Sequence, residues 1–209
     1  MTERQSKGEA RNSRLRKVAG DLFLKHGYEG VTVDKIVALA GGSKSTVYGE
    51  FGGKCGLFIS SIEELCRQSN EPLAMIDYTG LNLEQSLKKL AFQIVKHITS
   101  KRSVDLYRLA IGEAANCPEV GEAWYTHGPA RTASFLTEIL ERHRNELPKT
   151  SIPLKRVAVI LHDSLTGDVL YRLLAGITKQ ESDEEMRRIA NNAVDVVLTT
   201  LFAVRARSR

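Results

Sequence analysis

Residues 32–51 read TVDKIVALAGGSKSTVYGEF, and this segment determines the architecture that we expect for the N-terminal part of the chain. Thr32 and Ser43 each stand directly before a short apolar-periodic run, as residues that cap helix N-termini do. The Gly41-Gly42 pair between the two runs favours a sharp break in the chain. The segment therefore predicts two short helices joined by a tight turn, which is a helix-turn-helix.

A further helix is expected immediately before this segment. Asn12 or Ser13 can cap its start, and Gly27 ends it as a C-terminal cap. Between them, residues recur at the spacing of one helical face, and these are Leu15, Val18, Ala19, Leu22, Phe23 and His26. The sequence thus predicts three short helices around one small core.

The rest of the chain is also predicted to be helical. A fourth helix is expected at about residues 54–69, after Gly52-Gly53. Further helical patterns cover residues 82–100, 103–116, 119–145, 153–177 and 182–205, which gives about nine helices in all. Pro129 lies inside one of them and is expected to kink or split it. No strand-like alternation is found, so the expected fold class is all-α.

Positive charge is concentrated at the N-terminal end. The net charge is +5, and residues 1–54 carry ten Lys or Arg against six acidic residues, whereas the other 155 residues carry 20 basic and 19 acidic ones. This asymmetry indicates a polyanionic partner, although a solvated basic tail would give the same excess. The basic arm between Arg4 and Lys17 can add contacts to such a partner.

The chemistry of the exposed side chains favours DNA as that partner. A helix-turn-helix places its second helix in the major groove. The start of that helix carries an ammonium and two hydroxyl groups that can meet base edges, with a tyrosine one turn further on. Two other helix starts carry a threonine and a lysine, where the helix dipole favours phosphate. The residues expected to contact DNA are Thr32, Lys44, Ser45, Thr46, Tyr48 and Lys54.

This N-terminal part resembles the TetR family of bacterial transcriptional regulators. The matching positions span about 45 residues: Ala19-Gly20-Asp21-Leu22-Phe23, His26-Gly27-Tyr28-Glu29-Gly30-Val31-Thr32-Val33, Ile36, Ala40-Gly41-Gly42-Ser43-Lys44-Ser45-Thr46-Val47-Tyr48, Phe51, Lys54 and Leu57. The resemblance implies that Lys44 and Thr46 read bases and that Thr32, Tyr48 and Lys54 hold the DNA backbone.

The chain departs from the family pattern at two places. At Gly49-Glu50 the family commonly has an aromatic residue or histidine, and a carboxylate at Glu50 would repel phosphate. The second departure is Gly52-Gly53. No DNA contact is therefore expected from positions 49 and 50.

Resemblance in the remaining chain points to an AefR-like subgroup. The residues that carry it are Leu109-Ala110-Ile111-Gly112-Glu113-Ala114, Pro118, Trp124-Tyr125 and Gly128-Pro129. It implies two domains: residues 1–53, a helix-turn-helix DNA-binding domain with a basic N-terminal arm, and residues 54–209, a helical ligand-binding and dimerisation domain.

Family members dimerise by pairing their last two helices with those of a second subunit. Here one apolar row is Val157, Leu161, Leu165 and Val169, and another is Ile189, Ala193, Val197, Leu201 and Val204. Val194, Val196, Leu198 and Phe202 add further apolar faces to the last helix, which favours an interface. A core helix of a monomer is the competing interpretation.

Residues for the ligand, a metal or a cofactor are less clearly marked. Bulky or polar-tipped side chains of the middle helices are the candidates for ligand binding, namely Phe92, Tyr107, Trp124, Tyr125 and His127, although such residues more often serve packing. The five histidines form no metal-binding pair at four-residue spacing. Cys55, Cys66 and Cys117 lack a C-x-x-C spacing, so we expect free thiols, no metal and no cofactor.

The function expected is that of a ligand-responsive regulator, by family default a repressor. It would bind a pseudo-palindromic DNA operator as a homodimer and be released when an unknown small-molecule effector moves the helix that begins at Lys54. A cytoplasmic protein without a membrane partner is expected, because the N-terminus is polar and no long apolar run occurs. The residues leave two other classes of protein open. One is an enzyme using Cys117 or His162-Asp163, for which no catalytic motif is present, and the other is a helical sensor that no longer binds DNA.

Overall fold

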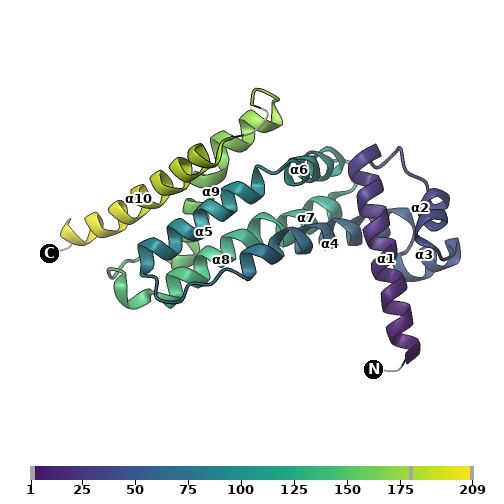
Figure 1. Ribbon diagram of the computed structural model, residues 1–209, viewed down its shortest axis with the longest axis horizontal. Helices are drawn as coiled ribbons and strands as arrows, with labels where there is room; N and C mark the ends of the chain where they lie inside the picture. The colour runs from purple at the N-terminus through teal and green to yellow at the C-terminus, as the bar shows by residue number, and fades with distance from the viewer. Residues whose placement is uncertain (1–2, 179–180, 208–209) are drawn as a thin grey trace. The chain divides into compact units, whose positions relative to one another are not determined.

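The computed structural model describes the backbone of residues 3–178 and 181–207, and the side chains of residues 7–178 and 181–203. Arg4 of the basic arm and Val204 of the last apolar row therefore lie outside the described side chains. Within these ranges the chain is all-helical, as predicted (Figure 1). The elements are α1 (Glu3–His26), α2 (Val33–Ala40), α3 (Lys44–Phe51), α4 (Lys54–Ala74), α5 (Leu83–Ile98), α6 (Lys101–Glu113), α7 (Pro118–His127), α8 (Pro129–Arg142), η1 (Arg144–Glu146), α9 (Leu154–Leu174) and α10 (Asp183–Arg207).

One helix boundary differs from the sequence expectation, and one expected helix is split in two. α1 begins at Glu3 instead of near Asn12. Residues that favour helices predominate in 3–12, but they form no apolar face from which periodicity could predict a helix. The helix expected at 119–145 is split into α7 and α8 at Gly128, directly before Pro129, as that proline predicted. Over the described backbone, this split accounts for one α-helix more than the nine expected.

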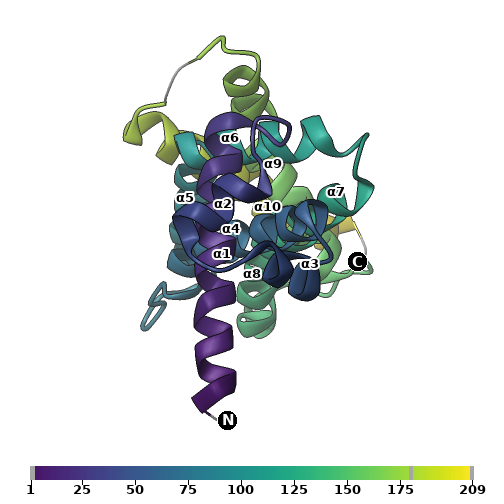
Figure 2. The ribbon, with the colours of Figure 1, turned by 90° about the vertical axis from the view of Figure 1, so that its right-hand side faces the viewer.

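The chain forms two compact units that do not follow chain order. The first comprises residues 1–69 and 105–128, so α1, α2, α3, most of α4, the larger part of α6, and α7 belong to it. α2 and α3 lie beside α1 in this unit (Figure 2). Its core is formed by buried apolar side chains from all of these helices, including Leu15, Phe23, Ile36, Val47, Leu57, Phe58, Ile62, Leu106, Ala110 and Val120.

The second unit comprises residues 70–104 and 129–209. In it α5 packs against α10, and α8 packs against α9. The start of α5 carries a reciprocal capping box, in which Asn82 accepts a bond from the Gln85 amide at 2.9 Å and Gln85 accepts one from the Asn82 amide at 3.1 Å. The core contains Leu87, Leu90, Ile94, Leu136, Ile139, Leu140, Leu161, Ala190 and Val194.

The apolar rows that were expected to face a second subunit lie mostly inside this core. Val157, Leu161, Leu165 and Val169 of α9 are buried, and so are Ala193, Val197 and Leu201 of α10. These helices present their main stripes to α5 and α8 because a single helix face cannot serve both the chain's own core and a partner. For these residues the structure shows the core packing that was the competing interpretation, and the pairing of the last two helices with a second subunit stays a prediction.

No helix in the described part of the chain is long and apolar enough to span a bilayer.

Candidate DNA-binding site

The helix-turn-helix is shaped by two side-chain caps and two glycines. Thr32 accepts a hydrogen bond from the Lys35 amide at 3.2 Å, and Ser43 accepts one from the Thr46 amide at 3.1 Å. Each bond satisfies one of the backbone donors that a helix start leaves open. Gly41 and Gly42 have φ of 71° and 118°, which residues with a Cβ rarely adopt. The predicted caps and turn are thus confirmed.

The start of α3 presents polar groups outward and one apolar residue inward. Val47 is fully buried in the core of the first unit, whereas Lys44, Ser45 and Tyr48 are exposed and Thr46 is half-buried. Since α3 is only two turns long, its polar side chains gather at one helix start. The structure therefore brings four of the six predicted DNA-contacting residues together, with exposed Thr32 at the start of the neighbouring α2.

Lys44 is not an isolated charge. Its Nζ lies 2.8 Å from Oδ1 of Asp34, in the first turn of α2. This bond to the carboxylate raises the pKa of the Lys44 ammonium above its ordinary value. Both side chains are largely exposed, so the pair positions the ammonium more than it stabilises the fold.

Lys54, the first residue of α4, rests on an aromatic cluster. Its Nζ lies 4.1 Å from the centroid of the Tyr28 ring, and that ring lies 4.8 Å from the ring of Phe58. A cation held over an aromatic face loses part of its freedom but keeps its charge. The ammonium is thus fixed at the start of α4, and only two residues separate it from the end of α3.

Comparison with protein families gives two matches along this chain. The family described as bacterial regulatory proteins, tetR family, matches residues 15–60. The family described as AefR-like transcriptional repressor, C-terminal domain, matches residues 85–200, which is more than half of the chain. The chain belongs to the TetR family. It is a transcriptional regulator with a DNA-binding helix-turn-helix fold, and the family is one of regulators rather than enzymes.

Solved structures of TetR-family proteins share the fold. A TetR-family transcriptional regulator from Mesorhizobium loti is 24% identical, with a TM-score of 0.74 over 96% of this chain and 98% of that one. The flavonoid-responsive regulator FrrA is 23% identical, with a TM-score of 0.75 over 91% and 96%. A TetR regulator from Agrobacterium tumefaciens is 20% identical, with a TM-score of 0.69 over 91% and 93%. Among curated proteins no significant sequence match is found.

Glu50, which departs from the TetR pattern, makes contacts with α1 that the sequence did not reveal. Its carboxylate contacts Asn12 and Arg11 of α1, 38 and 39 positions earlier in the chain. Spacing within α3 gives no signal for such a contact, because it depends on how α1 crosses α3.

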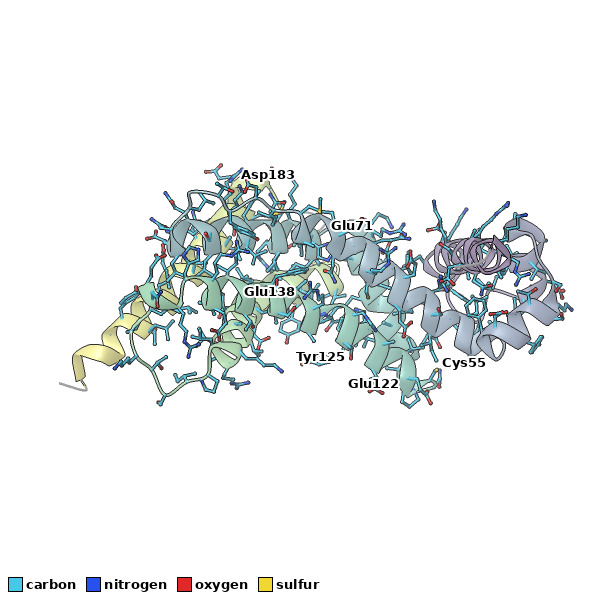
Figure 3. All side chains as sticks on the ribbon, turned by 90° about the horizontal axis from the view of Figure 1, so that it is seen from below. Cys55, Glu71, Glu122, Tyr125, Glu138 and Asp183 are labelled. Atoms are coloured by element: carbon cyan, nitrogen blue, oxygen red, sulfur yellow. The ribbon has the colours of Figure 1, made fainter. Side chains whose placement is uncertain are left out.

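Four of the residues predicted to bind the ligand belong to the first unit. Tyr107 and Trp124 form an edge-to-face pair with centroids 4.7 Å apart. Nε2 of His127 lies 3.9 Å from Oε1 of Glu63. Tyr125 is exposed on α7 (Figure 3). Their role in ligand binding stays a prediction.

The fifth, Phe92, belongs to the second unit. It is buried on α5, and the guanidinium of Arg187 lies 4.0 Å from its ring centroid. Four of the five candidates thus belong to the first unit and one to the second. Among the described residues, no group of three or more His, Cys, Asp or Glu side chains is arranged to hold a metal ion.

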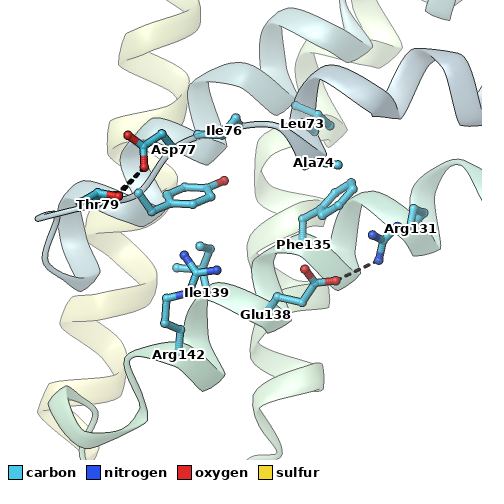
Figure 4. A pocket seen from close by; sticks show the side chains of 11 residues that line it. Leu73, Ala74, Ile76, Asp77, Thr79, Arg131, Phe135, Glu138, Ile139 and Arg142 are labelled. Atoms are coloured by element: carbon cyan, nitrogen blue, oxygen red, sulfur yellow. Dashed lines mark hydrogen bonds and ion pairs between the residues drawn. The ribbon is translucent and has the colours of Figure 1, made fainter.

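A cavity of about 540 Å³ opens in the second unit, between the end of α4, the loop after it and α8 (Figure 4). This volume is in the range of small-molecule sites. The residues lining it are Leu73, Ala74, Ile76, Asp77, Tyr78, Thr79, Arg131, Phe135, Glu138, Ile139 and Arg142. Sequence reasoning missed all of them, because α4 and α8 are separated by more than 50 residues in the chain.

Aromatic rings and arginines alternate along the cavity wall. Arg131 lies over the Phe135 ring at 4.0 Å and pairs with Glu138 at 2.9 Å. Arg142 lies 5.3 Å from the centroid of the Tyr78 ring. Burial raises the pKa of the Tyr78 hydroxyl to about 12, and this neutral hydroxyl can donate a hydrogen bond. The wall can therefore contact a flat apolar body and also bind a polar or anionic group.

Proposed function

We propose that this TetR-family chain is a ligand-responsive repressor, which binds a pseudo-palindromic operator as a homodimer and leaves it when a small-molecule effector binds. The observation that carries the proposal is the start of α3, where Lys44 and Ser45 are exposed beside Thr46 and above a buried Val47. Such a helix start can enter the major groove while the core holds its other face. The repressor would act on double-stranded DNA in the cytoplasm.

Dimerisation is supported by apolar side chains that the chain itself leaves uncovered. On α9 these are Ile160 and Tyr171, and on α10 they are Val196 and Phe202, the last two being 65% and 44% exposed. α9 and α10 pack against each other, so both outer faces belong to one unit. To bind adjacent half-sites on one face of a duplex, such a dimer needs its two α3 helices about 34 Å apart.

The effector site that we propose is the cavity beside α8. Its rings and arginines suit a planar aromatic molecule with a hydroxyl or carboxylate group. The flavonoid-responsive regulator that shares this fold is consistent with that class of ligand. The predicted set of Phe92, Tyr107, Trp124, Tyr125 and His127 remains the alternative location.

Release of DNA would use α4 as the connecting element. Only Gly52-Gly53 separates α3 from α4, and α4 continues to Ala74, which lines the cavity. A ligand that favours one position of α4 by about 1–3 kcal/mol would change operator affinity about 5- to 150-fold.

Footprinting of the DNA upstream of the chain's own gene tests this proposal. The full-length protein should protect two half-sites, and a hydroxylated aromatic acid or a flavonoid should remove the protection. Arg142→Ala should weaken that removal while it leaves the footprint intact, and Lys149→Ala, an exposed lysine of the second unit, serves as its control. Absence of binding to genomic fragments and random duplexes at low salt would overturn the repressor assignment.

A further inference from the structure

Two cysteines that are far apart in the chain meet in the first unit. Sγ of Cys55 and Sγ of Cys117 lie 3.0 Å apart, although 62 positions separate the residues. A covalent S–S bond measures about 2.05 Å, so the sulfurs need to approach by only about 1 Å to bond. The third cysteine, Cys66, is buried elsewhere on α4 and all three are free thiols.

The backbone on each side of this contact is anchored. Cys55 is the second residue of α4, and Leu57, two residues later, is buried and donates to the Gly53 carbonyl at 3.1 Å. Cys117 is the N-cap of α7, and its carbonyl accepts a bond from the Val120 amide at 3.0 Å. Leu57 and Val120 belong to the same core cluster, so the two helix starts are held near each other by packing and not by the sulfurs alone.

We propose that Cys55 and Cys117 form an oxidation site, which peroxide converts into an intramolecular disulfide. The proposal does not depend on the DNA-binding function. Cys55 is the sulfur that meets the oxidant, since it is exposed at the start of α4 (Figure 3), whereas Cys117 is partly covered.

The reaction needs two steps. The Cys55 thiolate attacks one peroxide oxygen, an S–O bond forms, the O–O bond breaks, and the departing hydroxide takes up a proton to become water. The Cys117 sulfur then attacks the Cys55 sulfur, an S–S bond forms, the S–O bond breaks, and the leaving hydroxide takes the Cys117 proton to become water. The two thiols are oxidised, one hydrogen peroxide is reduced, and two molecules of water are released.

The surroundings separate the roles of the three thiols. Burial, together with the contact to Cys55, raises the pKa of Cys117 to about 12, so this sulfur stays protonated until the second step. Burial raises the pKa of Cys66 to about 12 as well. Cys66 takes no part in the contact between Cys55 and Cys117. Oxidation should therefore consume two thiols and spare the third.

The disulfide would join the first turn of α4 to the start of α7 at their present separation. Because α4 follows α3 after two glycines, oxidation would hold the start of this helix in the arrangement described here. The crosslink closes a long loop, which restricts the unfolded chain and should raise the melting temperature by about 5–10 °C.

Treating the full-length protein with hydrogen peroxide tests the inference. We expect a loss of two hydrogen atoms in the intact mass, a crosslinked peptide pair containing Cys55 and Cys117, one remaining free thiol, and a rise in melting temperature that dithiothreitol reverses. Cys66→Ala should retain the crosslink and the rise. Cys55→Ser and Cys117→Ser should lose both, even where their starting stability differs from wild type.

Three results would overturn it. The first is persistence of three free thiols in excess peroxide. The second is conversion of Cys55 to sulfinic acid without a link to Cys117. The third is a disulfide-linked dimer on a non-reducing gel that accounts for all of the thiols lost. This result would show that Cys55 pairs between two copies of the chain instead.

Discussion

Glu50 accepts a hydrogen bond from Asn12, with 3.0 Å between Oε2 of the carboxylate and Nδ2 of the amide. Arg11 places its guanidinium 4.0 Å from the other carboxylate oxygen. The acid that departs from the TetR pattern is thus held by two side chains of α1, and it ties the end of α3 to that helix. Its negative charge is partly compensated within the protein, which explains how a DNA-facing module can retain it.

Replacing Glu50 with glutamine should strengthen nonspecific DNA binding. The glutamine side chain keeps a carbonyl oxygen that can accept from Asn12, but it lacks the charge that repels phosphate. We expect Kd for a random duplex at low salt to fall about threefold, and the free energy of unfolding to change by less than about 0.5 kcal/mol. Glu141→Gln, the same change in the second unit, is the control. An unchanged Kd would show that the Glu50 carboxylate lies far from bound phosphate.

Lys54 and Thr46 should affect DNA binding in different ways. Removal of a phosphate contact reduces the dependence of log Kd on log salt by about one unit, and we expect this for Lys54→Gln at every sequence. Thr46→Ala leaves the Ser43 cap bond to the backbone in place, so it should relax sequence preference while it keeps the salt slope. Fluorescence anisotropy over a salt series measures both. Equal loss of slope for the two variants would contradict the assigned roles.

The helix-turn-helix could be predicted from sequence because short-range rules fix it. Thr32 and Ser43 each accept a hydrogen bond from the backbone amide three residues later, and Gly41-Gly42 form the turn between the two helices. Each of these contacts spans only a few positions, so pattern and propensity are sufficient to find it.

The remaining features depend on contacts between distant segments. The cavity combines Leu73 with Arg142, and the thiol contact combines Cys55 with Cys117. Periodicity showed that α10 has apolar faces, but it could not show that Val197 would face the chain's own core while Val196 stayed exposed. Deciding between a core and a partner requires knowing which helices pack together.

Charge on the exposed face of α10 should disrupt the proposed homodimer. Val196→Glu would bury an unpaired carboxylate at the interface, and we expect the dimer dissociation constant to rise at least about tenfold. Sedimentation equilibrium measures this constant. Ile111→Glu introduces the same charge at an exposed apolar residue of α6 and should leave the dimer unchanged. If both variants remain dimeric, the interface lies elsewhere.

Two glycines of the helix-turn-helix offer a matched pair for backbone effects. Gly42 has φ of 118°, so Gly42→Ala should lower the free energy of unfolding by about 1–2 kcal/mol through backbone strain. Gly49 lies inside α3 with open space around its Cβ position, so Gly49→Ala should raise that free energy by about 0.5–1 kcal/mol. Urea unfolding of both variants measures the difference. A destabilising Gly49→Ala would show that α3 is not a regular helix at this position.

His97 should make the protein less stable as the pH falls below neutrality. Burial lowers the pKa of its imidazole from 6.5 to about 4. Between these values the unfolded chain binds a proton that the folded chain does not, so stability falls as the pH decreases. The neutral imidazole thus contributes about 3 kcal/mol to the free energy of unfolding above pH 6.5, and this contribution is lost as the pH falls to 4.

Glutamine at this position is neutral throughout, so the free energy of unfolding of His97→Gln should fall by about 3 kcal/mol less than that of wild type between pH 7 and pH 4. Urea unfolding of the two proteins at both pH values isolates this difference, because their carboxylates titrate alike. Parallel pH profiles would show that the imidazole is as well hydrated in the folded chain as in the unfolded one.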